Sequence, residues 1–124
     1  MAKQLLSITE LGGYPDFTPI YTQAGFAVTA VNSVRKAVSA LKKLQPDVIV
    51  TEFNFQSDFR DRTSSIETLM ATLQNTGAQP KMIVFYEVEY AEQFARVTSR
   101  FTIDHALTFP IDQALLADCL RDLA

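Results

Sequence analysis

The chain has few of the residues that most often carry catalytic or metal chemistry. Its 124 residues include one cysteine, Cys119, one histidine, His105, and no tryptophan. A lone cysteine forms no internal disulfide, and Cys119 falls on the apolar stripe of a helical pattern, so we expect a small core residue. His105 lies beside a short apolar strand, with no second metal-type ligand at useful spacing, which favours a structural role.

Long apolar runs and clustered positive charge are also scarce. No apolar run approaches the roughly 20 residues that a membrane span needs, and the apolar part of the N-terminus is too short for a signal peptide. The formal net charge is −3. The only basic cluster is Arg35, Lys36, Lys42 and Lys43, which favours the solvated face of an amphipathic helix. We therefore expect a cytoplasmic protein that binds neither membranes nor nucleic acid directly.

Hydrophobic periodicity alternates along the chain between strand and helix. The expected strands lie at 5–8, 27–31, 46–53, 82–85 and 106–108. The expected helices lie at 19–24, 34–44, 64–75 and 90–99, with a last one after Asp112. Such alternation implies parallel strands joined by right-handed crossovers. It favours a single α/β domain over residues 1–124, with a doubly wound five-stranded parallel sheet of order 2-1-3-4-5, the flavodoxin-like arrangement.

Local signals predict several helix ends. The predicted N-caps are short polar residues: Thr18, Asn32 or Ser33, Ser64 and Asp112. Ser64 with Glu67 three residues later has the capping-box pattern, and Gly77 is placed to end that helix. The pair Gly12 and Gly13 lacks the spacing of a phosphate loop, so a plain turn is favoured over an anion cradle.

Two carboxylates follow strands that this order makes neighbours. Glu10 comes after the first strand and Glu52 lies at the end of the third. The carboxyl ends of those strands meet at the topological switch point, where this architecture usually binds its ligand. The sequence therefore predicts that Glu10 and Glu52 converge.

Three segments carry a resemblance to a known family. They are Ala24-Gly25-Phe26, the strand from Pro46-Asp47 to Phe53, and Leu107-Thr108-Phe109-Pro110-Ile111. Over about residues 3–123 the chain resembles the response-regulator receiver domain, the phosphorylation switch of bacterial two-component signalling. The resemblance implies the flavodoxin-like receiver fold and a role in signal transduction.

The resemblance also implies which positions would do the work, and most of them are substituted. The equivalents are Thr9 and Glu10 for the acidic pair that holds Mg²⁺, Glu52 for the phosphoacceptor Asp, Phe85 or Tyr86 for the Thr or Ser that senses the phosphoryl group, Ala106 for the switch aromatic, and Phe109 for the Lys before Pro110. Only Pro110 and part of the acidity match the family pattern.

These substitutions predict that ordinary phosphorylation is lost. Glu52 reaches one methylene further than Asp, and a misplacement of about 1 Å can cost around a hundredfold in rate. Phe109 removes a cation that would stabilise charge on the transferring oxygens. A Thr in place of an Asp also leaves a poorer ligand set for Mg²⁺.

The residues leave three interpretations of Glu10 and Glu52 open. They could be solvated carboxylates at strand ends, a surviving weak cation site, or carboxylates neutralised by Arg60 or Arg62 from the following loop. For those arginines, pairing with Asp58 and Asp61 at the surface is the favoured interpretation.

The resemblance leads to a specific functional expectation. We expect a stand-alone, degenerate receiver domain that has no catalytic residues and no cofactor, and that acts through contacts with signalling proteins. A homodimer and an activated-like state imitated by Glu52 are left open. The alternative is a conventional, Mg²⁺-dependent, phosphorylatable response regulator. An enzyme of another flavodoxin-like family ranks third, because no nucleophile–base pair or phosphate-binding loop is present.

Overall fold

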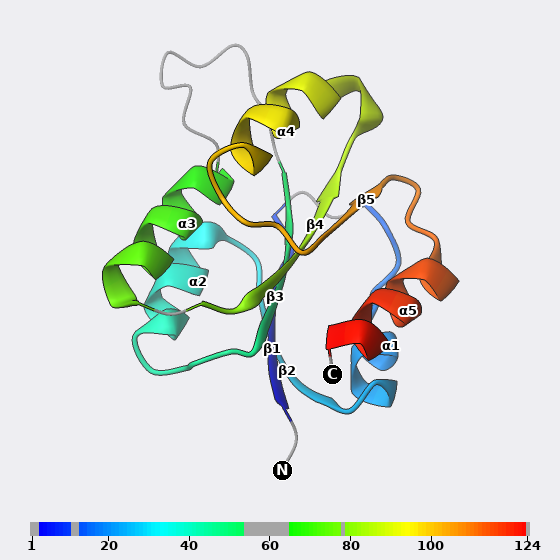
Figure 1. Ribbon diagram of the computed structural model, residues 1–124. Helices are drawn as coiled ribbons and strands as arrows, with labels where there is room; N and C mark the ends of the chain where they lie inside the picture. The colour runs from blue at the N-terminus through cyan, green and yellow to red at the C-terminus, as the bar shows by residue number, and fades with distance from the viewer. Residues whose placement is uncertain (1–2, 11–12, 54–64, 78, 124) are drawn as a thin grey trace.

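Five parallel strands form the centre of the molecule (Figure 1). The computed structural model describes residues 3–10, 13–53, 65–77 and 79–123. The strands are β1 (Lys3–Ile8), β2 (Phe26–Val31), β3 (Val48–Glu52), β4 (Lys81–Tyr86) and β5 (His105–Thr108). Their order is β2-β1-β3-β4-β5, with every pair parallel. The predicted fold class and strand order are confirmed.

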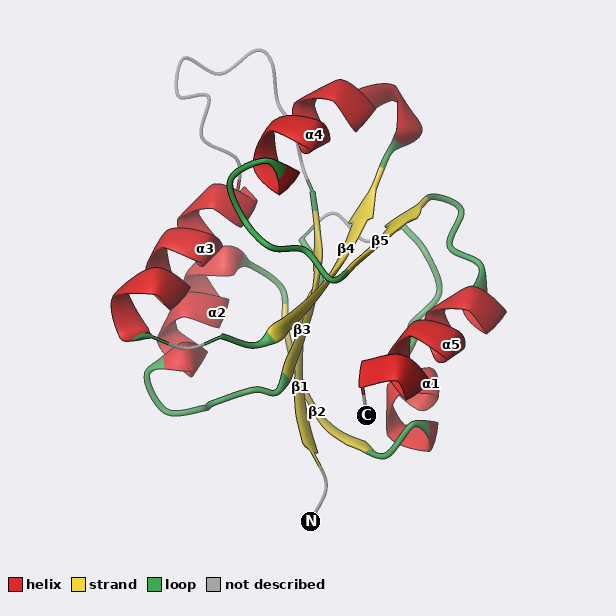
Figure 2. Cartoon of the chain, viewed as in Figure 1, coloured by secondary structure: helices red, strands yellow, loops and turns green. Residues whose placement is uncertain are grey.

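Helices cover both faces of this sheet (Figure 2). They are α1 (Thr18–Gln23), α2 (Val34–Leu41), α3 (Ser65–Thr76), α4 (Ala91–Thr98) and α5 (Gln113–Leu123), with a 3₁₀ turn at Val88–Tyr90 before α4. Side chains of α1 and α5 pack on one face of the sheet. Side chains of α2, α3 and α4 pack on the other. The molecule therefore has three layers, as doubly wound folds do.

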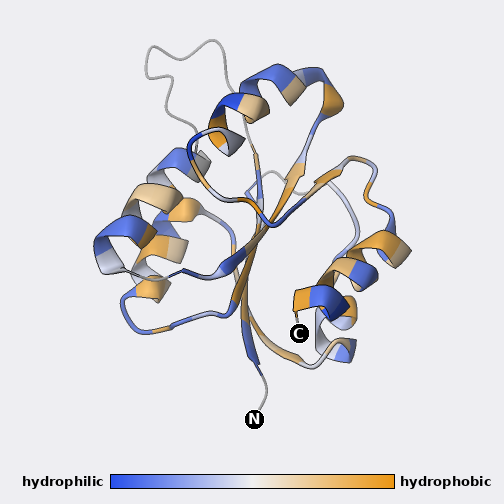
Figure 3. Cartoon of the chain, viewed as in Figure 1, coloured by the Kyte–Doolittle hydropathy of each residue, from blue (hydrophilic) through white to orange (hydrophobic). Residues whose placement is uncertain are grey.

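The core follows from the period of two along each strand. On β3, Val48 and Val50 face α1 and α5, whereas Ile49 faces α2 and α3. Val50 is 2% exposed while Asp47, just before the strand, is exposed, as the sequence predicts. Figure 3 shows the apolar strands at the centre and the polar outward sides of the helices. Burying each such aliphatic side chain contributes about 1.5–3 kcal/mol.

The helix ends match the sequence signals in part. The Ser33 hydroxyl accepts a hydrogen bond from the Lys36 N–H (3.1 Å) and caps α2. Asp112 accepts from the N–H groups of Ala114 (2.9 Å) and Leu115 (3.2 Å) and caps α5. Gly77, at φ +77°, follows the last residue of α3. Ser64 lies outside the described residues.

The first helix begins differently from the prediction that Thr18 is its N-cap. Thr18 is the first helical residue, and Phe17 holds the cap position without a side-chain cap bond. The Asp16 carboxylate instead accepts from both the N–H (2.9 Å) and the hydroxyl (2.7 Å) of Thr18. The Thr18 hydroxyl is thus used as a donor to Asp16, whose ionised carboxylate is a strong acceptor.

The lone cysteine and histidine are placed as the sequence predicts. Cys119 is a buried residue of α5, 6% exposed, and packs in the core, and burial raises the pKa of its thiol. His105 lies 3.2 Å from the Asp122 carboxylate of α5. Both residues therefore contribute to packing the C-terminal helix.

Candidate functional site

Glu10 and Glu52 meet at the carboxyl edge of the sheet. Glu52 is the last residue of β3, and Glu10 follows β1, its neighbour in the sheet. The Glu10 N–H donates a hydrogen bond to Glu52 Oε1 at 3.0 Å. The two residues are neighbours, as the strand order predicts, but the contact joins the Glu10 backbone, not its carboxylate, to Glu52.

Glu52 is buried, so the interpretation of a solvated strand-end carboxylate is wrong for this residue. Its side chain is among the most buried of the molecule, at 2% exposure. The Tyr14 hydroxyl donates a short hydrogen bond to Oε2, the oxygen that Glu10 leaves available. A buried carboxylate is tolerated when such donors replace its lost water.

The Glu10 carboxylate contacts the start of α2. It is only half-buried, and its Oε2 lies 3.5 Å from the N–H of Val34, the first residue of α2. A carboxylate is favourable at the positive end of a helix. The contact between the two acids described here therefore runs through the Glu10 backbone, with the Glu10 carboxylate turned towards α2.

Tyr14 is held in place by aromatic side chains. Its ring stacks on Phe17, with the ring centroids 5.6 Å apart, and meets the edge of Phe85 at 5.8 Å. Phe109 lies 5.3 Å away on another side. Burial and the bond to Glu52 both raise the pKa of the Tyr14 hydroxyl. Tyr14 therefore stays a neutral hydrogen-bond donor to Glu52 at ordinary pH.

The role of Tyr14 is not evident from the sequence pattern, because the segment before α1 has no regular periodicity. One usable signal was present: Tyr14 and Phe17 lie in a short, helix-poor segment that must cross the carboxyl edge of the sheet. An aromatic residue with a hydroxyl in such a segment is a candidate partner for a carboxylate at that edge.

The other predicted positions separate into two groups. Phe85 and Phe109 join the Tyr14 cluster, with their ring centroids 6.0 Å apart, and Thr9 lines the adjoining cleft. Tyr86 belongs to the opposite face of the sheet, where it stacks on Phe94 at 4.5 Å.

The parallel register explains which residue lies beside Glu52. Glu52 pairs with Phe85, so these two side chains share a face of the sheet. The sequence left Phe85 and Tyr86 as alternatives, and Phe85 is the one on the Glu52 side. Ala106 is exposed on β5. Pro110 follows Phe109 through a cis peptide bond.

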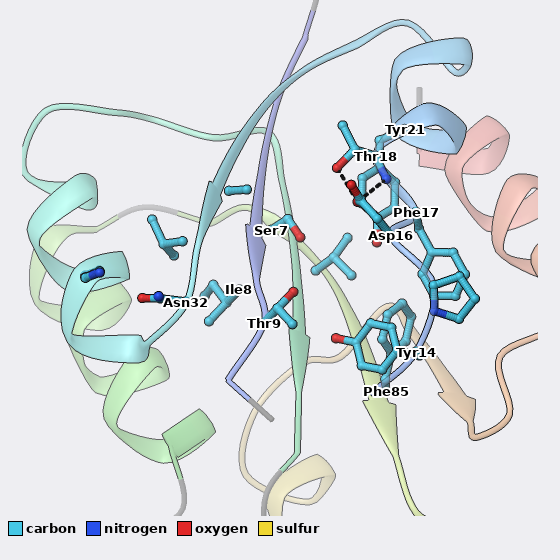
Figure 4. A pocket seen from close by; sticks show the side chains of 15 residues that line it. Ser7, Ile8, Thr9, Tyr14, Asp16, Phe17, Thr18, Tyr21, Asn32 and Phe85 are labelled. Atoms are coloured by element: carbon cyan, nitrogen blue, oxygen red, sulfur yellow. Dashed lines mark hydrogen bonds between the residues drawn. The ribbon is translucent and has the colours of Figure 1, made fainter. Parts of the chain in front are cut away.

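The cluster around Tyr14 borders a cleft of about 510 Å³ between the C-terminal part of β1, the end of β2 and the segment that leads into α1 (Figure 4). Ser7 of β1 and Thr9, just after β1, point towards the side of the cleft that carries Tyr14, Asp16 and Phe17. The buried Glu52 carboxylate is absent from its lining.

Comparison with known proteins identifies the architecture. No family model and no curated protein matches the sequence. Among solved structures, a response-regulator receiver domain from Clostridium thermocellum superimposes with a TM-score of 0.75 at 13% identity, over 98% of this chain and 93% of that one. The chemotaxis response regulator CheY4 of Vibrio cholerae matches over 100% of both chains, with a TM-score of 0.69 and 14% identity. The chain has the receiver fold.

Another match extends the range of proteins with this architecture. A protein of the streptococci, from a family described as redox sensors that evolved from two-component response regulators, has a TM-score of 0.78 at 15% identity. The match covers 98% of this chain and 51% of that one. At such identities the comparison concerns the receiver fold alone.

Receiver domains hold Mg²⁺ in their acidic pocket, and the residues described here do not fit that ion. Mg²⁺ requires oxygen ligands in near-octahedral geometry. Both Glu52 oxygens already accept hydrogen bonds, and the Glu10 carboxylate turns towards α2. Within the described ranges, no three His, Cys, Asp or Glu side chains gather as ligands. Arg60 and Arg62, the proposed internal cations, lie outside the described residues.

Within the described part of the chain, no helix combines the length and apolar character that spanning a bilayer requires.

Proposed function

We propose that this chain is a signalling domain of the receiver type that acts through protein–protein contacts without phosphorylation of the Glu52 position. The observation that carries the proposal is the state of the Glu52 carboxylate. It is 2% exposed, and each of its oxygens accepts a hydrogen bond, one from the Glu10 backbone and one from Tyr14.

Phosphoryl transfer would have to overcome this arrangement. The attacking oxygen must approach the phosphorus in line, and cations must neutralise the charge on the transferring oxygens. At Glu52 the oxygens are already bonded, and the rings of Tyr14, Phe85 and Phe109 surround the position. Aromatic side chains supply no positive charge there. We infer that Glu52 is retained for its hydrogen bonds.

The proposal includes a cytoplasmic location and signalling proteins as partners, with neither nucleic acid nor membrane bound directly, as expected from the sequence. The streptococcal redox sensors support it by analogy, since they are described as derived from response regulators. No enzymatic activity and no cofactor are proposed. A homodimer is compatible with the proposal but is not part of it.

A conventional response regulator is the second candidate. The contact between Glu10 and Glu52 favours it, because two acids at the ends of β1 and β3 occupy the place of the receiver pocket. This candidate requires Tyr14 to leave Glu52 and both carboxylates to turn towards a cation. It predicts phosphorylation in the presence of Mg²⁺.

One experiment separates the candidates. The protein is incubated with Mg²⁺ and a small phosphodonor such as acetyl phosphate, and its intact mass is measured. We expect no added phosphoryl group. A matched triple variant tests whether the fold itself permits the reaction. Glu52→Asp restores the phosphoacceptor, Phe109→Lys restores the cation, and Tyr14→Ala opens access to the carboxylate. A phosphoryl adduct on the unmodified protein that disappears in Glu52→Gln would overturn the proposal.

A further inference from the structure

The two edges of the sheet differ in how they are protected against pairing with another chain. β5 is four residues long, begins directly after Asp104 and ends two residues before Pro110. Short length, a charged neighbour and a nearby proline all discourage the addition of a further strand. β2 is six residues long and contains no charged residue, proline or glycine. Of the two edges, β2 is therefore the one that is open to another strand.

The absence of charge extends beyond β2. Residues 17–34, which include α1 and β2, contain no Asp, Glu, Lys or Arg, although these residues make up 20% of the chain. Burial does not explain the absence, because Ala27, Thr29 and Ala30 of β2 are exposed, as are Thr22 and Gln23 of α1. The cores of protein–protein interfaces are depleted in charged residues in the same way. The surface formed by α1 and β2 therefore has the composition of an interface.

Alternate residues of β2 direct their backbone groups away from the sheet. The Val31 carbonyl accepts a hydrogen bond from the Thr9 N–H and therefore faces β1. Backbone groups alternate between the two sides of a strand, so those of Phe26, Val28 and Ala30 face outwards. In the described sheet no strand lies beyond β2. These outward N–H and C=O groups form the kind of edge to which an extended segment adds.

We propose that β2 pairs antiparallel with β2 of a second copy of this chain, so that the two sheets become continuous across a two-fold axis. The outward groups determine the register. With Val28 opposite Val28 of the partner subunit, Phe26 lies opposite the partner's Ala30, and all three outward residues form hydrogen-bonded pairs. A shift of the register in either direction leaves one of the three outside the paired strands.

The composition of this surface favours a second copy over a charged partner. A charged segment would find no counter-charge on α1 or β2, and its own charges would lose water on binding. A second copy brings an uncharged strand of equal length. Lys36 lines the cleft at the C-terminal end of β2, and antiparallel pairing places the two copies of this residue at opposite ends of the shared edge. The two-fold contact also closes after two chains, so it does not lead to fibres.

The proposed dimer is weak and independent of the Glu52 chemistry. One pair of short strands covers less surface than the total of about 1,600 Å² that a standard interface buries, so we expect association at high micromolar concentrations. The inference goes beyond the proposed function and does not rest on it, because β1 separates β2 from the strand that carries Glu52.

Sedimentation velocity, measured from low micromolar to millimolar protein, tests the dimer and its edge. Ala30→Pro removes an outward N–H while leaving the bonds to β1, and it should weaken association by about tenfold or more. The matched control is Ala106→Pro on β5. Ala106 is also exposed and also faces outwards, because the adjacent ladder bond runs from the Phe109 N–H to the Tyr86 carbonyl. This control should leave the dimer unchanged. Where circular dichroism shows that a proline variant does not fold, Ala30→Lys and Ala106→Lys make the same comparison, since an edge lysine opposes strand pairing.

Disulfide cross-linking tests the register. In the proposed pairing Ala27 lies opposite Thr29 of the partner subunit, within disulfide reach, whereas neither residue lies opposite its own copy. Chains with Ala27→Cys are mixed with chains with Thr29→Cys, each also carrying Cys119→Ser, and are oxidised mildly. We expect a covalent dimer in the mixture and little or none in either variant alone. Cross-linking of each variant alone, to the same extent as in the mixture, would refute this register.

Added salt distinguishes the proposed contact from one made by ion pairs. The surface is without charge, so association should not weaken as the salt concentration rises. Three results would overturn the proposal: a monomer at millimolar concentration, a dimer that salt dissociates, or a dimer that Ala106→Pro weakens and Ala30→Pro does not. Any of these would leave the proposed function standing. Phosphorylation of Glu52 would refute that function and leave the β2 contact intact, so the two failures are distinguishable.

Discussion

The hydroxyl of Tyr14 donates a hydrogen bond to the buried carboxylate of Glu52. The two residues are far apart in the sequence, and the bond connects the segment before α1 to the end of β3. It gives the carboxylate a neutral donor where receiver domains place a metal ion and a phosphoryl group. This hydrogen bond therefore bears both on the stability of the fold and on phosphorylation at Glu52, which we propose is lost.

We expect Tyr14→Phe to destabilise the protein by about 1.5–3 kcal/mol, because it leaves one oxygen of a buried carboxylate without this donor while keeping the ring. Chemical denaturation measures the change. Tyr86→Phe is the matched control, since its ring stacks on Phe94 on the other face. Equal effects of the two substitutions would show that the Tyr14 hydroxyl has no special role.

Stability should fall at alkaline pH through Tyr14 and Tyr21. Burial raises the pKa of both hydroxyls in the folded protein, whereas the unfolded chain has the ordinary tyrosine value of about 10. Above that pH the folded state binds more protons than the unfolded state, so the unfolding free energy decreases as pH rises. Urea denaturation between about pH 8 and pH 11 should show a shallower decrease in Tyr14→Phe and Tyr21→Phe. Parallel curves for all three proteins would contradict this assignment.

Val50→Asp should destabilise the protein by about 3 kcal/mol or more, because Val50 is 2% exposed and an unpaired charge in the core is costly. Thr29→Asp, at an exposed position of the edge strand β2, is the control and should have little effect. Thermal melts of both variants check the placement of β3. A soluble Val50→Asp protein with an unchanged melting temperature would refute it.

Millimolar Mg²⁺ should leave the melting temperature unchanged. A ligand stabilises a protein appreciably only when its concentration passes its dissociation constant, and both Glu52 oxygens already accept hydrogen bonds. Differential scanning calorimetry with and without Mg²⁺ measures the effect. A Mg²⁺-dependent stabilisation that Glu52→Gln abolishes would instead support the conventional response regulator.

The sequence by itself determined the sheet and its order to a large extent. The run Val48-Ile49-Val50 is apolar on both faces, as a central parallel strand must be, and strands that alternate with helices restrict the connections to a few topologies. The meeting of Glu10 and Glu52 follows from that topology, because each residue lies at the carboxyl end of a neighbouring strand. Periodicity and connectivity are properties of the chain, so they can be deduced before the fold is known.

Only the tertiary structure decided the state of Glu52 and the existence of the cleft. Whether a strand-end carboxylate is solvated or buried depends on what crosses above it, and Tyr14 arrives from a segment without periodicity. The start of α1 likewise depended on the contact that the Asp16 carboxylate makes with the N–H and hydroxyl of Thr18. The cleft at Ser7 and Tyr21 results from how much of the sheet a six-residue helix leaves uncovered. These outcomes depend on packing between distant segments, which local patterns in a sequence do not encode.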